Sequence, residues 1–141
     1  MRLSTKSRYA TRLLLDIAKQ YKKGTIQSQD IARRQNISQK YIEQIIIPLK
    51  KANYIKSVRG AKGGHMLAKS PEAITVGEIV ALLEGGSSLT ECSENPEACD
   101  KVDTCLTRYL WREAAKAMYE KLNSITFSDL IEMEQALNTV R

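Results

Sequence analysis

Apolar residues in the first part of the chain recur with the period of an amphipathic helix. They are Tyr9, Ala10, Leu13, Leu14, Ile17, Ala18 and Tyr21. Ser4 and Thr5 stand before this run as N-cap residues, and Gly24 stands after it as a stop signal. The pattern predicts one long helix that buries one of its faces.

A second helical segment follows, and a tight turn separates it from a third. The second covers residues 29–35 after Ser28, and Asn36 interrupts it before Ser38 offers another N-cap. The third begins at Gln39, and its apolar stripe consists of Ile42, Ile45, Ile46 and Leu49. Two helices joined in this way form a helix-turn-helix motif, whose second helix presents its N-terminal side chains to bases in the major groove.

A β-hairpin is predicted directly after these helices. Residues 54–59 have the pattern of a strand, residues 60–64 form a glycine-rich turn, and residues 65–68 return as a second strand. Arg59 and Lys62 lie at its tip, where long cations can follow the DNA backbone or enter the minor groove. This order of elements predicts a winged helix-turn-helix DNA-binding domain over residues 1–70, with its recognition helix at about 39–52 and its wing at about 54–68.

The second half of the chain has a different organisation. Ser70 and Pro71 mark the boundary, and residues 75–78 match a capping box that begins a short helix. Residues 89–103 have no periodicity, a long helix begins at Cys105, and Thr126 and Asp129 cap a last helix. We therefore expect a mainly α protein with a small β-hairpin wing (α+β), in which residues 71–141 hold a loop at about 87–105 and the helices that form a dimer.

The charge of the chain divides at the same boundary. The net charge is +6, yet residues 1–70 hold 16 Lys and Arg against three acids, an excess of +13, while residues 71–141 carry −7. A positive excess of this size suits a polyanion, because neutralised phosphates release condensed counterions. Double-stranded DNA is the leading partner, and a solvated basic surface is the alternative.

We expect three groups of side chains to contact DNA. They are the recognition-helix residues Ser38, Gln39, Lys40, Tyr41, Glu43 and Gln44, the wing residues Arg59 and Lys62, and the N-terminal residues Arg2, Lys6 and Arg8. DNA phosphates repel a carboxylate, and a hydrogen bond that it accepts from a cytosine amino group can offset this repulsion. Glu43 is therefore a candidate specificity residue. The alternative for Glu43 is an ion pair within its helix or across a dimer.

Three cysteines share one acidic segment, with the spacing Cys92-x6-Cys99-x5-Cys105. Neither a membrane span nor a signal peptide is recognisable, so we expect a cytoplasmic protein, in a compartment where thiols stay reduced. Three soft thiolates on a flexible loop are typical of a metal or iron–sulfur centre, which needs a fourth ligand from elsewhere. A redox thiol switch and incidental thiols are the alternatives.

Several ordered blocks of sequence resemble the IscR-type regulators, a family of bacterial winged-helix transcription factors. The blocks are residues 1–10 (MRLSTKSRYA), 37–45 (ISQKYIEQI), 57–60 (SVRG), 63–64 (GG), 75–79 (TVGEI) and 105–111 (CLTRYLW). The family includes iron–sulfur sensors, nitric-oxide sensors and repressors without a cluster. The resemblance runs nearly end to end, and it implies a homodimer, with the long helix after Cys105 at its interface, on a pseudo-palindromic operator.

The resemblance also implies an iron–sulfur cluster, because the cysteines stand where cluster-binding members of the family place theirs. We favour [2Fe–2S] over [4Fe–4S], although Arg108 stands where the best-known [2Fe–2S] member has a histidine. Arg8 stands where nitric-oxide-sensing relatives supply an aspartate from the partner subunit. The fourth ligand therefore stays open among an exogenous group, Arg108, Asp100, Asp103, Glu91, Glu94 and Glu97.

The sequence as a whole predicts a sequence-specific DNA-binding transcriptional regulator whose operator affinity is controlled by an iron–sulfur cluster on Cys92, Cys99 and Cys105. Its only histidine, His65, lies on the predicted wing, where packing or a phosphate contact is expected rather than metal ligation. No pair of base and nucleophile is apparent, so an enzyme is not expected. The alternatives are a winged-helix repressor with a zinc or thiol-redox switch, and an iron–sulfur carrier protein.

Overall fold

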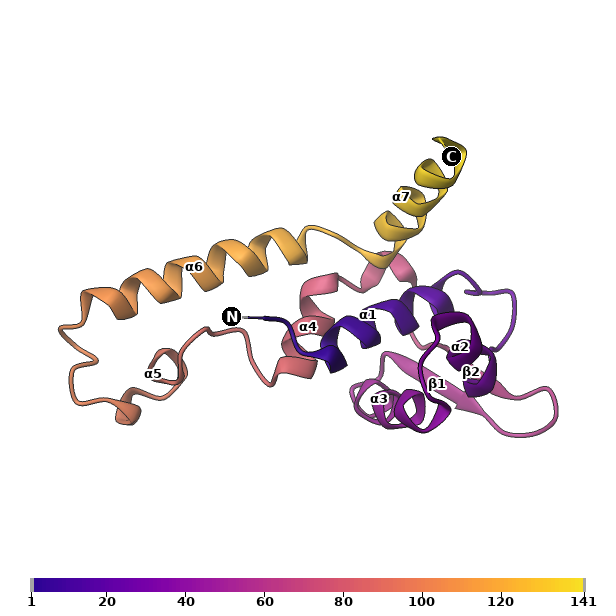
Figure 1. The fold of residues 1–141 in the computed structure, drawn as a ribbon, viewed down its shortest axis with the longest axis horizontal. Coiled ribbons are helices and arrows are strands. Elements are labelled where there is room, and N and C mark those ends of the chain that lie inside the picture. The colour runs from indigo at the N-terminus through magenta and orange to yellow at the C-terminus, as the bar shows by residue number, and fades with distance from the viewer. Residues whose placement is uncertain (1, 141) are drawn as a thin grey trace.

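Two parts of different shape make up the structure, a winged-helix body and an arm beside it (Figure 1). This computed structural model describes residues 2–140. The elements in chain order are α1 (Thr5–Ala18), α2 (Ser28–Gln35), α3 (Gln39–Lys51), β1 (Ile55–Val58), β2 (Gly64–Leu67), η1 (Pro71–Ala73), α4 (Val76–Glu84), α5 (Glu91–Glu94), η2 (Pro96–Ala98), α6 (Leu106–Asn123) and α7 (Phe127–Val140). The arm is defined as residues 85–123 and contains α5, η2 and α6, and the other elements form the body.

Helix α1 forms where the apolar period predicts it. The hydroxyl of Ser4 accepts a hydrogen bond from the backbone N–H of Ser7 at 3.0 Å, which satisfies one of the free donors of the first turn. The helix ends at Ala18, earlier than the predicted stop at Gly24, because residues 19–23 close in turns. Its buried face packs against α4 and α7 as well as α3, so two helices of the second half complete the core of the body.

Two polar residues set the turn between α2 and α3. Asn36 ends α2 in a left-handed conformation (φ 54°, ψ 48°), which asparagine tolerates better than most residues. Ser38 then caps α3, as predicted, by accepting from the backbone N–H of Tyr41 at 3.2 Å. Ser28 is not the N-cap of α2, contrary to expectation, because Gln27 occupies that position and Ser28 begins the helix.

The wing is an antiparallel pair of strands, with Ile55 opposite Leu67. A third segment joins it, because Ile26 exchanges backbone hydrogen bonds of 2.9 and 2.7 Å with His65. Gly64 has φ 146°, and a Cβ there would lie 2.6 Å from the carbonyl oxygen of Ile26. The close pairing between the wing and the segment before α2 therefore requires glycine at this position.

Reciprocal caps begin two helices of the second half, as the sequence predicts. Thr75 and Glu78 form a capping box at α4, and Thr126 and Asp129 bond to each other's backbone at the start of α7. The segment expected to lack regular structure contains two short elements, α5 and η2, the second of which starts with the side chain of Asn95 accepting a backbone hydrogen bond. Elements this short depend on single polar residues, so a periodicity analysis misses them.

The arm leaves the body after the last residue of α4 and returns to it beside the first residue of that helix. A backbone hydrogen bond of 2.8 Å joins Val76, at the start of α4, to Ile125, just before α7. The hydroxyl of Tyr119 in α6 donates to the carbonyl oxygen of Gly86 at 3.3 Å. The end of α6 is therefore attached both to the first residues of the arm and, through Ile125, to the start of α4.

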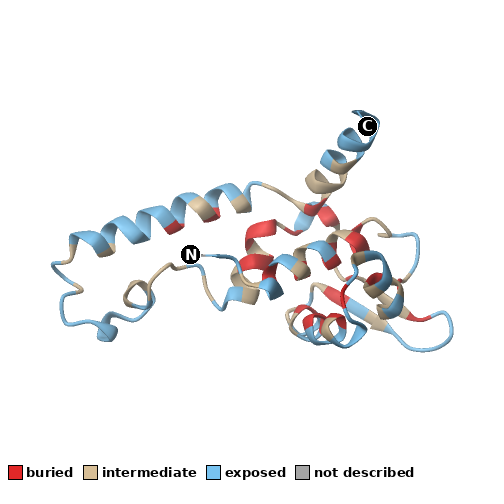
Figure 2. Ribbon diagram, viewed as in Figure 1, coloured by how far each residue is buried: buried red, intermediate tan, exposed pale blue. Residues whose placement is uncertain are grey.

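Burial separates the two parts (Figure 2). The body holds nearly all of the buried apolar side chains, among which Leu13, Leu14 and Phe127 are fully buried. In the arm, where every residue is described, Ala115 and Tyr119 are the only buried residues. Across residues 2–140, no helix combines the length and the apolar character needed to cross a lipid bilayer.

Candidate nucleic-acid interface and cysteine loop

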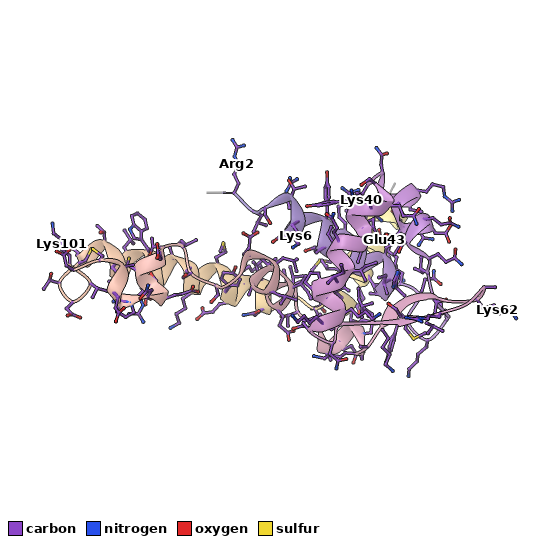
Figure 3. The ribbon with its side chains drawn as sticks, turned by 90° about the horizontal axis from the view of Figure 1, so that it is seen from below. Arg2, Lys6, Lys40, Glu43, Lys62 and Lys101 are labelled. Carbon is purple, nitrogen blue, oxygen red and sulfur yellow. The ribbon has the colours of Figure 1, made fainter. Side chains whose placement is uncertain are left out.

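The face of α3 that points away from the core is exposed. Its residues are Gln39, Lys40, Glu43, Gln44, Ile47, Lys50 and Lys51. Seen from below the body, Lys40 and Glu43 project from α3, and Lys62 projects from the far end of the wing (Figure 3). A recognition helix and a wing thus lie on the same part of the body, as expected for a winged helix that meets a DNA duplex.

The Glu43 carboxylate has a partner within its own helix. The side-chain amide of Gln39 donates to Glu43 Oε1 at 3.2 Å, and no ion pair of Glu43 occurs within the described chain. This hydrogen bond holds two exposed polar side chains together, one turn apart. A base that approached either of them would meet both.

Tyr41 is oriented toward the body rather than outward. It is partly buried, and its ring packs edge-on against Tyr9 of α1 with 5.8 Å between ring centroids. The guanidinium groups of Arg8 and Arg12 lie 5.9 and 5.3 Å from the centre of the Tyr9 ring. The two tyrosines therefore form a platform that carries basic side chains of α1 beside the recognition helix.

A groove of about 270 Å³ separates α3 from the wing. Gln39 and Glu43 line one side of it, and Gln29, Ser57 and His65 are among the residues lining the rest. Sequence reasoning missed Gln29 and Ser57, because residues this far apart along the chain carry no local signal that they meet. The groove puts amide, hydroxyl and imidazole groups near the side chains predicted to read bases.

Both ring nitrogens of His65 are hydrogen-bonded within the body. Nε2 lies 2.8 Å from the hydroxyl of Ser28, and Nδ1 lies 2.8 Å from the hydroxyl of Ser57. Burial, followed by the nearby charge of Lys50, lowers the pKa of His65 below its ordinary value. His65 thus packs between the wing and α2, and it is not part of the cysteine loop.

The tip of the wing is anchored from behind. The hydroxyl of Thr25 donates to the carbonyl oxygens of Lys62 and Gly63, both at 3.1 Å. The side chains of Arg59 and Lys62 remain exposed. The anchor restrains the backbone that carries these two cations, which lowers the entropy lost when they contact a ligand.

The N-terminal segment is attached to the end of α4. The carboxylate of Glu84 accepts hydrogen bonds from the hydroxyl of Ser7 at 2.5 Å and from the backbone N–H of Ser4 at 2.9 Å. These bonds, that of Ser7 first, lower the pKa of Glu84 below its ordinary value. Lys6 and Arg2 are exposed, and Arg2 lies away from Lys40, on the side of the body that faces the arm (Figure 3).

The three cysteines are free thiols along the outer part of the arm. Cys92 in α5 is partly buried, with its sulfur 3.3 Å from the hydroxyl of Thr90. Cys99 is exposed just after η2, and Cys105 occupies the N-cap position of α6. The three cysteines, although close in sequence, therefore lie in three different local environments.

Cys105 is the thiol whose surroundings favour ionisation. Its sulfur lies 3.2 Å from the hydroxyl of Thr107, and this hydrogen bond, followed by one from the backbone N–H of Arg108, lowers the pKa of Cys105. The Arg108 side chain reaches in another direction, because its Nε donates to the carbonyl oxygen of Cys92 at 2.9 Å. Arg108 therefore links α5 to the start of α6.

The donor set fits an iron–sulfur cluster in its chemistry, since three free thiols stand close together in sequence at the end of one long helix. Within residues 2–140, however, no three His, Cys, Asp or Glu side chains are grouped so that they could hold a metal ion. Ligation by all three cysteines therefore requires residues 92–105 to rearrange.

Comparison with known proteins identifies the family to which this fold and these motifs belong. Residues 3–133 match the Rrf2 family, described as an iron-dependent transcriptional regulator. The chain belongs to the Rrf2 family. Like other Rrf2 proteins it is a DNA-binding transcriptional regulator with a winged-helix fold, as the sequence predicted.

Two relatives show how far this similarity extends. The protein rrf2 of Nitratidesulfovibrio vulgaris is 50% identical over 131 residues, which cover 93% of this chain and 87% of that protein. The HTH-type transcriptional regulator IscR of Escherichia coli O1:K1 is 36% identical over 138 residues, which cover 98% of this chain and 85% of that protein. The family description and the name of the second relative both state a role as a transcriptional regulator, and neither names an enzyme.

Solved structures give the same result for the fold. IscR of T. potens matches with a TM-score of 0.78 and 35% identity, covering 95% of this chain and 88% of that one. CymR, the global cysteine regulator of B. subtilis, matches with a TM-score of 0.78 and 36% identity, covering 94% of this chain and 98% of that one. The Rrf2 fold is thus shared by proteins named for different regulatory roles, and the residues of the arm must indicate the role of this one.

Proposed function

We propose that this Rrf2 protein is a homodimeric regulator whose affinity for its operator is controlled by an iron–sulfur cluster held by Cys92, Cys99 and Cys105. The observation that carries the proposal is the position of the three free thiols, which end at the N-cap of the long helix α6. Relatives named IscR are consistent with a cluster. A change at these thiols would act directly on the start of α6.

The DNA-binding surface in this proposal combines α3, the wing and the N-terminal segment. Ser38, Gln39, Lys40, Tyr41, Glu43 and Gln44 would contact DNA from the recognition helix, and Arg59, Lys62, Arg2, Lys6 and Arg8 would contact phosphates or the minor groove. Exposure of all of these side chains except the partly buried Tyr41 supports this assignment. A dimer would place two such surfaces on half-sites one turn apart, about 34 Å.

The outward face of α6 is the proposed dimer interface. Leu106, Tyr109 and Leu110 lie on it, and their side chains are largely exposed, Leu106 at 79%. Large apolar side chains grouped on one helix mark a protein interface more often than a free surface. A pseudo-palindromic operator follows from the two-fold symmetry of such a dimer.

When bound, an iron–sulfur cluster would cross-link the three thiolates, and this cross-link would depend on iron and on redox state. We propose that the cluster is of the [2Fe–2S] type. The thiols would ionise and bind, with Cys105 predisposed to do so by Thr107 and Arg108. Because Arg108 already bonds to the backbone of Cys92, a loop carboxylate or an exogenous group is a better candidate for the fourth ligand.

A thiol or zinc switch is the second candidate, and the exposure of Cys99 favours it. An exposed free thiol can react or bind zinc without an assembled cluster. In that case the same arm would still transmit a change from the thiols to α6, but without iron.

Visible absorbance with iron and sulfide analysis on protein purified without oxygen tests the cluster. We expect thiolate-to-iron bands in the wild type and in Lys101→Ala, a matched control at the tip of the arm, and their loss in Cys99→Ala. Operator affinity measured over a salt series should then differ between the cluster-bound and cluster-free forms by about 5- to 150-fold. A colourless, iron-free wild type would rule out the cluster and favour the zinc or thiol switch. Equal operator affinities of the cluster-bound and cluster-free forms would rule out control of DNA binding by the cluster.

A further inference from the structure

Three consecutive isoleucines in α3 have different environments. Ile45 is fully buried and Ile46 is 4% exposed, so both belong to the core of the body. Ile47 is 64% exposed, although it follows them directly. The helix turns about 100° per residue, which moves the third isoleucine out of the buried stripe.

Ile47 lies in the middle of the outward face of α3. Glu43 and Gln44 precede it by about one turn, Lys40 by about two turns, and Lys51 follows it by about one turn. All four of these side chains are exposed and polar. Ile47 is therefore the apolar exception on the face that the proposed function turns toward DNA.

A single exposed isoleucine on an ordinary surface needs no explanation, but this face has a specific ligand. From Lys40 to Lys51 the helix advances about 16 Å, at about 1.5 Å per residue, whereas the major groove is about 12 Å wide. The two lysines can therefore approach phosphates on either side while Ile47, between them, faces the bases. The apolar group that the major groove offers is the 5-methyl of thymine.

We propose that Ile47 is a specificity-determining residue that contacts the 5-methyl group of a thymine in the operator. This inference rests on the proposed use of α3 as the recognition helix. Glu43 and Gln39, which are linked by a hydrogen bond, would meet the polar edges of neighbouring bases, and Ile47 would add preference for a methylated pyrimidine at one position.

The test uses duplexes selected by the full-length wild type from a random pool, with each thymine replaced singly by deoxyuridine, which removes only the methyl group. We expect wild-type affinity to fall about four-fold at one thymine of each half-site, the effect of exposing one buried methyl-sized group. The Ile47→Ala variant should bind the thymine and uracil duplexes equally at that position. Lys51→Ala, the matched control, should bind all duplexes more weakly and keep the four-fold difference.

Each other outcome has a defined meaning. If deoxyuridine lowers the affinity of wild type and Ile47→Ala by the same factor at every thymine, the assignment of Ile47 is wrong. The proposed DNA binding would still stand. Failure of the wild type to select any duplex would overturn the proposed function itself. Dissociation of the oligomer in Ile47→Ala, seen by sedimentation, would assign the side chain to a contact between protein copies instead. Since Ile47 is exposed, the variant should unfold at the same urea concentration as the wild type.

Discussion

The body and the arm belong to the same chain but differ in how many of their apolar side chains are buried. In the body, α1, α3, α4 and α7 surround a core of fully buried leucines and isoleucines, and each of these four helices begins with a side-chain N-cap. In the arm, α6 has 18 residues but buries only Ala115 and Tyr119, and its outward apolar side chains face solvent. The body encloses a core of its own, whereas the arm has almost no buried core and leaves apolar side chains and thiols exposed to further partners.

Truncation of one leucine in each part should reveal the largest difference in stability between the body and the arm. Leu14→Ala in α1 should lower the free energy of unfolding by about 2–5 kcal/mol, because the side chain is fully buried. Leu106→Ala in α6 should change it by less than about 0.5 kcal/mol, since this side chain is mostly exposed. Urea unfolding at concentrations low enough to keep the protein monomeric measures both. Similar losses in the two variants would show that the arm packs within its own chain.

A second experiment asks whether the exposed face of the arm is an interface. Leu110→Glu should weaken self-association by about 30-fold or more, because a charge would be buried at the centre of the proposed contact. Sedimentation velocity over a range of concentrations measures the change. Leu137→Glu on α7 is the matched control, since Leu137 is similarly exposed on a helix of the body. If both variants dissociate equally, the interface is not specific to α6.

The smallest expected effect lies at the junction of the two parts, where Glu84 ends α4. The pKa of Glu84 is lowered in the folded protein, so its contribution to stability is present above the ordinary pKa of 4.5 and is lost as the pH falls through the folded value. Glu84→Gln should cost about 1 kcal/mol or less at pH 7, because solvent screens this exposed carboxylate.

Urea unfolding of Glu84→Gln as a function of pH tests this difference. The difference in the free energy of unfolding between wild type and Glu84→Gln should become smaller as the pH falls. Glu72→Gln, at an exposed carboxyl on η1, serves as the control and should leave stability unchanged. A difference that stays constant with pH would mean that the charge of Glu84 does not contribute.

Features encoded by neighbouring residues could be predicted from the sequence. The cap at Ser38, the capping box of Thr75 and Glu78, and the pair Thr126 and Asp129 each depend on groups three residues apart in the sequence, and all three are confirmed. The order of helices, hairpin and long helix followed from periodicity and turn residues for the same reason.

Features that depend on packing could not be predicted. The bond from Ser7 to Glu84 joins residues 77 positions apart, and the anchor from Thr25 to the tip of the wing joins positions far apart as well. The orientation of Arg108 toward the backbone of Cys92 depends on how α5 lies against α6, which the cysteine spacing does not reveal. For the candidate site, the three cysteines and the outward residues of α3 could be named from the sequence, whereas Gln29 and Ser57 could be found only from the structure.

The attachment of the arm to the body has a consequence for how regulators with this fold diversify. Because the arm begins at Gly85, just after α4, and Ile125 pairs with Val76 at the start of α4, the arm is an excursion with both ends attached to the same helix of the body. Insertions, deletions or new ligating residues inside such an excursion leave the frame that carries α3 and the wing unchanged. If the arm senses the signal, as proposed above, evolution can exchange that signal while it keeps the DNA sequence that is recognised.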